Sequence, residues 1–397
     1  MKLERPKKSK IYLIIAIALV IIIAAVSYFL LIPKDRLNNT TNPSDQSSNI
    51  EKPRQNIIHF AAMGDMLAHD TIIANAKSDD GYDFTNFFAN ISPNYQDSDV
   101  VFCNQEGLSS GENYGISGYP SFNAPTKFAN DLQSAGCNLI NLANNHMGDK
   151  GTNAINATVN LWQSLKPLGF SGANLDSDMQ NQVSYFEKNG IKVGFVSFAD
   201  FNNNQATPAY AVNNYHDEAL VRKLINDARA NADLVVVSMH WGVEDSNIVS
   251  ADQETEVSLL SSLGVDVIIG TGPHVLQRVQ VANRDDGGKT IVFYSLGNML
   301  SSQLLTKELI GGIAKFDVTR PDSGKVIISN LSFIPTYMHY EWTAAQSLNG
   351  DLLARKNAMI YTLKDSAVPL SRSLLNTTVE TQKQYVVDTL GTDITVQ

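Results

Sequence analysis

The sequence predicts an α/β fold in which a sheet is covered by helices on both faces. Apolar, strand-like runs alternate with helix-like segments from residue 57 to about residue 300, which is the pattern of layered α/β folds. These runs are apolar at nearly every position, as expected when both faces of a sheet are buried. Polar side chains follow most of them, at the edge where α/β folds bind ligands.

The N-terminal stretch predicts a membrane anchor. Residues 1–10 carry five basic side chains and one acidic one, and residues 11–32 form an apolar run without a charge. At about 1.5 Å per residue, a helix over this run spans a hydrocarbon core of about 30 Å. The basic flank places residues 1–10 in the cytoplasm as a tail and the main domain outside the cell. We therefore expect a single-pass signal anchor in the cell membrane.

A cleavable signal peptide is the alternative interpretation of this stretch. Its apolar region is normally shorter, about 7–15 residues, and no small-x-small cleavage site stands before Pro33. Residues 33–56 are polar, with prolines and a run of Asn, Thr, Ser and Gln. Such a composition does not bury enough apolar surface to fold, so it predicts a flexible stalk.

The main domain is expected over residues 57–340. Helix Thr152–Leu165 has the clearest periodicity, because Ile155, Val159 and Trp162 recur at three- and four-residue spacing. The expected strands are Ile57–Met63, Val100–Cys103, Asn138–Leu142, Val193–Phe198, Leu234–Met239, Val265–Ile269 and Thr290–Tyr294. The other expected helices are Thr126–Ala135, Asp217–Ala230 and Asp252–Leu263.

The pattern changes after residue 312. Ile313–Thr319 and Lys325–Ile334 flank a Pro-Asp-Ser-Gly turn and predict a β-hairpin. From Ala344 the chain is expected to be helical, and it becomes polar after Ser371. Residues 341–397 are thus expected to form a C-terminal helical extension and a polar tail.

Charge and cysteine content narrow the class of protein. A formal net charge of −10 argues against nonspecific binding to nucleic acid, which requires a basic face. Cys103 and Cys137 both lie within apolar runs, which favours small buried side chains. A disulfide is the alternative if the two segments are neighbours, since an extracellular compartment tolerates one.

Polar groups at the predicted strand ends point to a ligand site. A lone histidine in such a place is more often structural, and an Asp or Asn there is commonly a helix cap. Repetition makes a ligand site the better interpretation, because four of the seven histidines follow predicted strands and acidic or amide side chains follow other predicted strands. Mixed oxygen and imidazole ligands suit Mn, Fe, Zn or Mg. The four histidines are His69, His146, His240 and His274.

Six short motifs together resemble the CapA family of poly-γ-glutamate capsule synthesis proteins, within the calcineurin-like metallophosphoesterase superfamily. The resemblance covers roughly Ile57 to Asn298. It implies a four-layer α/β/β/α sandwich, metallophosphatase-like, with a site for one or two divalent metal ions between the strand ends of two sheets. The motifs are Gly64-Asp65, Asn104-x-Glu106, Ala143-Asn144-Asn145-His146, His240-Trp241-Gly242-x-Glu244, Gly270-x-x-Pro273-His274-Val275 and Tyr294-Ser295-Leu296-Gly297-Asn298.

The resemblance also implies roles for individual residues. His146 corresponds to a proton donor, and Asp149 is expected to hold it. The expected metal ligands are Asp65, Asn104, Glu106, Asn145, His240 and His274. The expected substrate contacts are His69, Trp241, Glu244 and Asn298.

Two positions depart from the superfamily's pattern. An Asp-x-His motif usually comes first, but Leu67 stands where that histidine belongs, and His69 is the nearest substitute. The last motif often has two histidines, and here Gly272 occupies the place of the earlier one. A single metal ion, or a loosely bound second one, is consistent with these changes.

Two functions follow from the resemblance. The first is a metal-dependent hydrolase or transferase that acts on an anionic envelope polymer or its phosphorylated precursor. The second is a non-catalytic polymer-binding or scaffold subunit of the capsule synthesis and export complex, with other capsule synthesis membrane proteins as partners. The departures at Leu67 and Gly272 favour the second, and the retained acids and histidines favour the first.

Overall fold

The computed structural model describes residues 56–322 and 324–397. The expected cytoplasmic tail (1–10) and transmembrane anchor (11–32) lie outside the described residues, as does the stalk (33–56) apart from its last residue. Within the described part of the chain, no helix combines the length and the apolar character needed to cross a bilayer.

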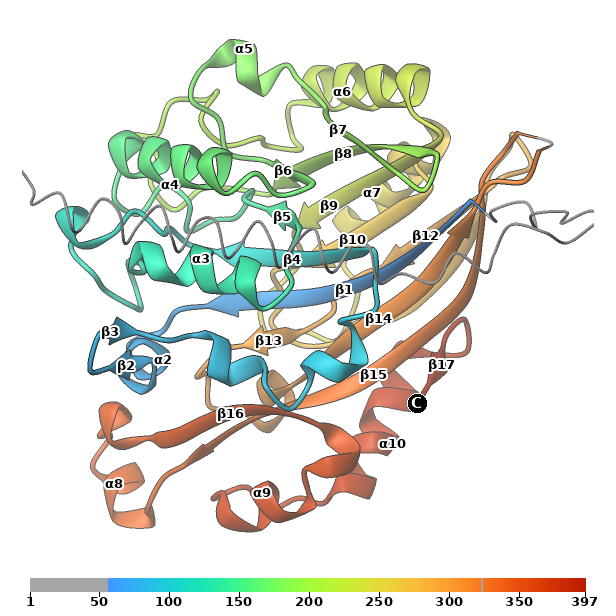
Figure 1. The fold of residues 1–397 in the computed structure, drawn as a ribbon. Coiled ribbons are helices and arrows are strands. Elements are labelled where there is room, and N and C mark those ends of the chain that lie inside the picture. The colour runs from blue at the N-terminus through green and yellow to red at the C-terminus, as the bar shows by residue number, and fades with distance from the viewer. Residues whose placement is uncertain (1–55, 323) are drawn as a thin grey trace, which may run out of the picture. The chain divides into compact units, whose positions relative to one another are not determined.

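The larger of the two main sheets has nine strands (Figure 1). Its path runs β16-β15-β14-β1-β4-β5-β6, with β13 beside β1 and β17 beside β15. Strands β1, β4, β5 and β6 are parallel, whereas β14, β15 and β16 add an antiparallel half. The bounds are β1 (Ile57–Leu67), β4 (Val100–Glu106), β5 (Leu139–Asn141), β6 (Gly169–Ser171), β13 (Asn298–Leu300), β14 (Ile310–Thr319), β15 (Ile327–Glu341), β16 (Lys356–Thr362) and β17 (Thr395–Val396).

The second sheet has six strands in the order β11-β12-β10-β9-β8-β7. Its central strands β8, β9, β10 and β12 are parallel. The bounds are β7 (Ser184–Lys188), β8 (Ile191–Ala199), β9 (Leu234–His240), β10 (Val267–Thr271), β11 (Val279–Asn283) and β12 (Lys289–Phe293). A separate small hairpin consists of β2 (Lys77–Ser78) and β3 (Gly81–Tyr82).

The α-helices connect and cover these sheets. They are α2 (Asp70–Asn75), α3 (Thr126–Ser134), α4 (Thr152–Leu165), α5 (Ser177–Gln180), α6 (Glu218–Asn231), α7 (Ala251–Ser262), α8 (Ala344–Leu348), α9 (Ala367–Arg372) and α10 (Val379–Leu390). Short 3₁₀ turns are η1 (Thr85–Phe88), η2 (Ser92–Asn94), η3 (Glu112–Tyr114), η4 (Thr306–Leu309), η5 (Leu352–Ala354) and η6 (Leu363–Asp365).

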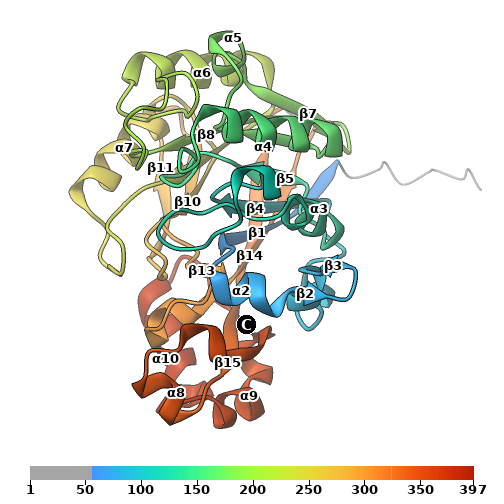
Figure 2. The ribbon, with the colours of Figure 1, turned by 90° about the vertical axis from the view of Figure 1, so that its left-hand side faces the viewer.

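The two sheets pack face to face. The rings of Phe102 on β4 and Phe195 on β8 are 6.1 Å apart, and those of Phe293 on β12 and Phe316 on β14 are 5.9 Å apart. Helices α6 and α7 bury a second apolar cluster against the outer face of the six-stranded sheet. Helices α3 and α4 lie beyond the nine-stranded sheet, so Figure 2 shows the order helix, sheet, sheet, helix. The expected α/β class is confirmed.

Local sequence explains the principal helices. Helix α4 has the bounds expected from its periodicity, and Ile155, Val159 and Trp162 are all buried. Helix α7 begins at a capping box, in which the Ser250 hydroxyl accepts from the Gln253 amide and the Gln253 side chain returns to Ser250. Such reciprocal capping satisfies backbone N–H groups that the first turn leaves without partners.

The C-terminal region differs from the helical extension and polar tail that the sequence predicted. Strand β16 pairs with β15 and widens the main sheet. The chain after Ser371 forms α10, whose Val386 and Leu390 are fully buried. The prediction of a wholly helical extension is therefore wrong. A few apolar residues are enough to hold β16 and α10 in place when each of those residues packs against the main sheet. The proposed domain boundary at residues 340 and 341 stays a prediction.

The favoured interpretation of the cysteines is also corrected. Cys103 on β4 and Cys137, which immediately precedes β5, form a disulfide across 34 residues of chain. Both are fully buried, as expected, but Cys137 lies at the entry to a strand that neighbours β4, and the two cysteines are bonded rather than free. The spacing of the two cysteines in the sequence did not show whether their segments are neighbours. The structure shows that they are, and this decides for the disulfide over two free cysteines.

Three glycines allow the strand ends to approach the segment from residue 294 to residue 298. A Cβ on Gly64 of β1 would lie 1.9 Å from the Gly297 carbonyl oxygen, and one on Gly270 would lie 2.0 Å from the Tyr294 oxygen. A Cβ on Gly311 would lie 2.0 Å from the Asn298 oxygen. Because the obstacles are backbone atoms, side-chain rotation cannot relieve these clashes.

We predict that Gly64→Ala lowers the free energy of unfolding by about 3 kcal/mol, at the upper end of typical overpacking costs. The new methyl group would push β1 away from Gly297, whose oxygen accepts from the Asp65 amide at 3.0 Å. Urea unfolding followed by circular dichroism measures the change. The matched variant Gly194→Ala, where the nearest atom is the Ala228 Cβ at 3.2 Å, should cost less than about 1 kcal/mol. Equal costs for the two variants would contradict the explanation.

Candidate metal centre

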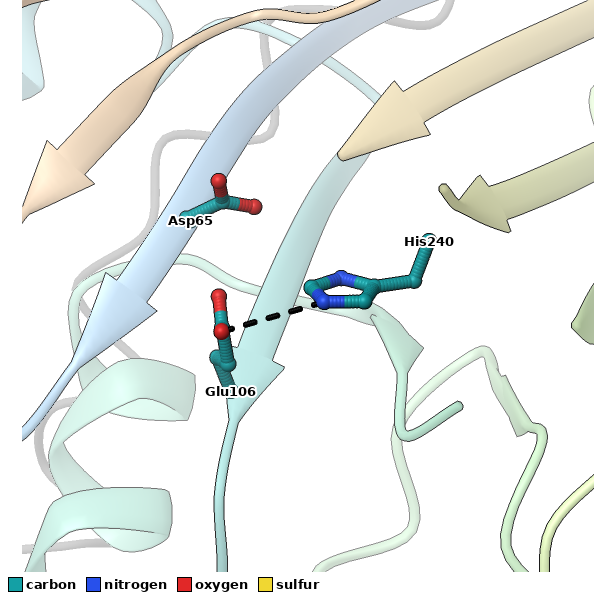
Figure 3. Close-up of side chains that lie close together, drawn as sticks. All are labelled: Asp65, Glu106 and His240. Carbon is teal, nitrogen blue, oxygen red and sulfur yellow. Dashed lines mark ion pairs between the residues drawn. The ribbon is translucent and has the colours of Figure 1, made fainter. Parts of the chain in front are cut away.

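Three chelating side chains converge at the carboxyl ends of strands from both sheets. Asp65 lies two residues before the end of β1, Glu106 ends β4 and His240 ends β9, and all three are buried (Figure 3). One ligand atom from each lies within 4.8 Å of the others. The Nε2 atom of His240 is 3.8 Å from Oε1 of Glu106. The parallel strands of each sheet end at the same edge, so the packing of the two sheets creates this cluster.

His274 joins the cluster from the loop after β10. Its Nδ1 lies 3.1 Å from Oδ2 of Asp65, and its Nε2 lies 3.6 Å from Oε1 of Glu106. Its backbone φ is +61°, a left-handed conformation that is rare for a residue with a side chain. Such strain persists where the surroundings impose it, which is common at functional sites.

The two carboxylates have very different surroundings. Asp65 accepts from Asn104 Nδ2 at 2.8 Å and from the Gly272 amide at 3.2 Å to each oxygen. Among the described residues, neither oxygen of Glu106 has a hydrogen-bond donor. A buried carboxylate without donors is costly unless a cation pairs with it. A divalent metal ion fits this donor set of two carboxylates and imidazoles.

Burial and mutual charge shift the pKa values of this cluster. Burial raises the pKa of Glu106 well above its usual range, although the charge of His274 opposes the shift. The pKa of Asp65 is lowered, because burial is outweighed by the hydrogen bond and charge of His274. Burial alone would lower the pKa of His274, but Glu106 and Asp65 raise it to about 10. Burial lowers the pKa of His240 to about 3, so its imidazole is neutral, the form that binds metals.

A hydrogen-bonded pair of an imidazole and a carboxylate lies beside the cluster. His146 Nδ1 is 2.8 Å from Oδ2 of Asp149, which also accepts from the Phe122 amide at 2.6 Å. The Phe122 ring packs edge-on against the His146 ring, with the centroids 4.6 Å apart. Asn145 connects this group to the cluster, because its Oδ1 lies 3.1 Å from Nε2 of His240.

The expected ligand Asn104 has a different set of partners. Its amide group donates to Asp65, and its oxygen accepts from Asn141 Nδ2 at 2.8 Å. With both ends of the amide engaged, Asn104 orients the Asp65 carboxylate. Direct coordination by Asn104 stays a prediction.

The four expected substrate contacts occupy different places. Asn298 Oδ1 is 3.2 Å from Nδ1 of His274, and its amide group donates to Gln303 and to the Glu308 carbonyl. Trp241 is buried, donates to the Tyr294 carbonyl at 2.9 Å and lines a cavity beside His240, so its contact with substrate stays a prediction. Glu244 is exposed and lines a cavity of about 250 Å³ beside His240.

His69 does not replace the histidine missing at Leu67. It lies outside the cluster, where its Nδ1 accepts from the Ser302 amide at 3.4 Å and its ring packs against Phe122. Gly272 has no room for the second missing histidine. A Cβ there would lie 3.2 Å from His240 Nε2 and 3.0 Å from the Trp241 carbonyl oxygen, and φ is +103°. These contacts favour a single metal ion.

Several residues of the centre were not identified from the sequence. Thr271 Oγ1 lies 3.0 Å from Nδ1 of His240 and orients that ring. Asn203 Nδ2 lies 3.2 Å from Nδ1 of His146. Asn141 and Thr271 end the observed strands β5 and β10 and lie within two residues of the predicted strand ends, so a search around those ends could have found them. Asn203 lies in a long polar loop without such a signal.

Comparisons with known proteins identify similar sequences in one bacterial family. The family model described as "Bacterial capsule synthesis protein PGA_cap" matches residues 59–303. The chain is 28% identical over 242 residues to the PGA biosynthesis protein CapA of Bacillus subtilis strain 168, covering 59% of both proteins. It is 29% identical over 251 residues to the capsule biosynthesis protein CapA of Bacillus anthracis, covering 61% of this chain and 59% of that protein. The match thus spans less than two thirds of either relative.

Solved structures with a similar arrangement are more distant. A putative 5'-nucleotidase from Staphylococcus aureus superimposes with a TM-score of 0.46 at 15% identity, over 75% of this chain and 58% of that one. The NAD nucleotidase of Haemophilus influenzae gives 0.42 at 12% identity, over 71% and 52%. Both scores are below 0.5, so neither likeness supports an assignment of activity.

We predict that the purified protein binds Mn²⁺ or Zn²⁺ near stoichiometrically and that His240→Ala weakens binding by about 100-fold or more. Loss of an outer partner of a ligand typically costs 10–100-fold, and loss of a ligand should cost at least as much. Metal analysis after equilibrium dialysis measures occupancy. The exposed His59, paired with Asp317 at 2.6 Å, provides the control His59→Ala, which should bind normally. Absence of bound metal at every concentration supplied would refute the metal centre.

Glu106→Gln should separate metal binding from folding. The substitution removes a buried charge without donors, so the free energy of unfolding of the metal-free protein should stay the same or rise. The gain on adding metal, about 2.7 kcal/mol at 100 times Kd, should disappear. Thermal unfolding with and without Mn²⁺ measures both effects. The buried Glu308, which accepts from the amides of Leu304 and Leu305, provides the control Glu308→Gln, which should keep the gain. A large loss of stability in metal-free Glu106→Gln would contradict this assignment.

Proposed function

The chain belongs to the bacterial capsule synthesis protein family, and on that premise we propose that it is a metal-dependent hydrolase or transferase of envelope polymer synthesis. The observation that carries this proposal is the donor-free, buried Glu106 carboxylate beside Asp65 and His240. A scaffold has no physical need for a buried acid without partners, whereas a metal enzyme does. The calcineurin-like metallophosphoesterase mechanism implied by the sequence resemblance is part of this proposal.

Asp65, Glu106 and His240 would hold the ion, and His274 would join them on losing its proton to solvent. The Asn145 amide oxygen, 3.1 Å from Nε2 of His240, is a further candidate ligand. When bound there, a divalent cation polarises a phosphoryl or carbonyl oxygen and supplies hydroxide near neutral pH. Thr271 fixes the His240 ring through Nδ1, which leaves Nε2 directed at the cluster. Outer partners of this kind are a general feature of metal sites.

His146 supports the proposed chemistry as the proton donor to the leaving group. The Asp149 carboxylate at 2.8 Å keeps a proton on Nδ1, so Nε2 is the nitrogen that exchanges a proton with substrate. The Phe122 amide fixes Asp149 in turn. A positioned acid of this type typically contributes 10²–10⁴-fold to a rate.

We further propose a place and partners for this activity. Residues 11–32 would anchor the chain once in the cell membrane, with residues 1–10 in the cytoplasm and the main domain outside. The substrate would be an anionic envelope polymer or its phosphorylated precursor. Other membrane proteins of capsule synthesis would be partners.

A non-catalytic scaffold or polymer-binding subunit is the second candidate. Leu67 and Gly272 support it, because they remove two histidines and the space at Gly272 is closed. In that case the old metal site would only shape a groove for the polymer.

Cells that produce the capsule can separate the two functions. We predict that chromosomal Asp65→Ala and His146→Ala each reduce surface polymer about tenfold or more, as deletion does, because each removes part of the chemistry. The control His59→Ala, far from the centre, should leave polymer unchanged. Immunoblotting must show equal amounts of each variant. If both site variants make normal polymer and deletion abolishes it, the scaffold function is correct.

A further inference from the structure

A second cavity, of about 540 Å³, lies next to the metal centre. It is bounded by α2, the loop around Tyr119 and the segment at Leu352 to Arg355. Figure 1 and Figure 2 show α2 close to the C-terminal part of the chain that carries α8. The His69 ring in its wall is 5.1 Å from the Phe122 ring, which contacts His146. The His69 wall of the cavity is therefore connected, through the Phe122 ring, to His146, the proton donor of the proposed reaction.

The wall of this cavity contains a buried guanidinium without a counter-ion. Arg355 is only 4% exposed, yet none of the ion pairs among the described residues includes it. Its Nε donates to the Leu352 carbonyl at 2.9 Å and its Nη2 to Thr71 Oγ1 at 2.7 Å, and the Ser302 carbonyl accepts from Nη1. These oxygens are neutral, so they hold the guanidinium in place without compensating its charge.

Aromatic rings reinforce the position of this cation. The Arg355 guanidinium carbon lies 4.8 Å from the Tyr340 ring centre and 5.5 Å from that of Trp342. Cation–π contacts stabilise a desolvated guanidinium but leave its net charge intact. A buried cation usually pairs with an acid, so this arrangement favours binding of an anion that the described residues do not supply.

His69 supplies a second donor in the same wall. Its Nδ1 accepts from the Ser302 amide at 3.4 Å, which places the proton of the neutral ring on Nε2. Burial and the nearby positive groups His274 and Arg355 lower the pKa of His69 to about 3, so the ring stays neutral. Its N–H group can then donate to an anion without adding a charge.

The rim of the cavity is apolar and exposed. Tyr119 is 74% exposed, Leu353 is 62% exposed and Leu352 is 46% exposed, and all three line the cavity. Large apolar side chains gathered around one opening commonly mark a ligand site. They would cover an aliphatic stem whose charged end reaches inward.

We propose that this cavity is a substrate subsite that binds a carboxylate on a short aliphatic stem, paired with Arg355 and Nε2 of His69. This inference rests on the proposed function, because it assigns the cavity to the same substrate as the metal centre. One buried positive charge balances one carboxylate, whereas a phosphate dianion would keep an uncompensated charge. Asp70 and Lys77 carry opposite charges, line the opening and are both exposed to solvent, so their charges are screened and Arg355 remains the buried charge of the cavity.

Glutarate is the probe that tests this subsite, with its neutral diamide glutaramide and inorganic phosphate as comparisons. Ligand-observed NMR titrations use the full chain after dialysis to remove metal, so that binding at the metal centre does not contribute. We expect glutarate to bind about tenfold or more tightly than glutaramide, because the diamide loses the charge-assisted hydrogen bond to Arg355. Phosphate should also bind more weakly than glutarate, because its dianion keeps an uncompensated charge and it has no aliphatic stem to cover the apolar rim. Equal binding of glutarate and glutaramide would overturn the subsite, and tighter binding of phosphate would overturn its assignment to a carboxylate.

Variants locate the binding within the chain. Arg355→Gln should weaken glutarate about tenfold, whereas the exposed Arg372, paired with Glu341 at 3.3 Å, provides the control Arg372→Gln that should not. A folded Arg355→Gln variant with wild-type affinity would refute the proposal. If Arg355→Gln does not fold, the exposed Tyr119→Ala should still weaken glutarate severalfold, and unchanged binding would count against the subsite.

Metal analysis of the same samples distinguishes this inference from the proposed function. Bound metal without glutarate selectivity refutes only the subsite. Glutarate selectivity without metal binding at any concentration refutes the metal-dependent function and leaves an anion-binding cavity.

Discussion

Two carboxylates buried on neighbouring strands impose the constraint on which the rest of the site depends. In the parallel pairing of β1 with β4, Asp65 lies opposite Asn104 and Leu67 lies opposite Glu106, so both acids lie at one sheet edge. Two negative charges on adjacent strands cannot both be buried unless a positive charge lies nearby. His274 provides it within the chain, in contact with Asp65 and near Glu106. The Asn104 and Gly272 donors all serve Asp65, which leaves Glu106 dependent on a cation.

The same constraint explains why the centre lies between two sheets. Asp65 and Glu106 come from the nine-stranded sheet, whereas His240 ends a strand of the six-stranded sheet. Their spacing is therefore set by the packing of the aromatic core between the sheets. Gly64 and Gly270 bring both sheets against the Tyr294 to Gly297 segment, which a side chain would prevent. A rigid frame of this kind holds ligands more precisely than loops do.

The residues that follow the family match contribute one wall of the cavity at Arg355. The match ends at residue 303, but β16 extends the main sheet and brings the 352–355 segment against α2. Arg355 is held there by Thr71 and Ser302, one from just after β1 and one from just after β13. The metal centre and the charged cavity thus share the segments after β1 and β13. In the proposed function, one substrate would contact both.

The sequence by itself determined the α/β class, most helix and strand positions, and the set of polar strand ends, because apolar periodicity and polar breaks are local properties. It also indicated that Asp65, Glu106, His240 and His274 follow separate strands, because the order of strands and motifs along the chain can be read from the sequence. Only the tertiary structure decided that Cys103 bonds Cys137, that residues 356–362 form a strand, and that His69 leaves the metal cluster. Only the structure could reveal that, among residues 56–322 and 324–397, Glu106 has no hydrogen-bond donor and Arg355 has no acidic partner. Those facts depend on which side chains meet across the sheets, and partners that are distant in sequence are absent from any local pattern.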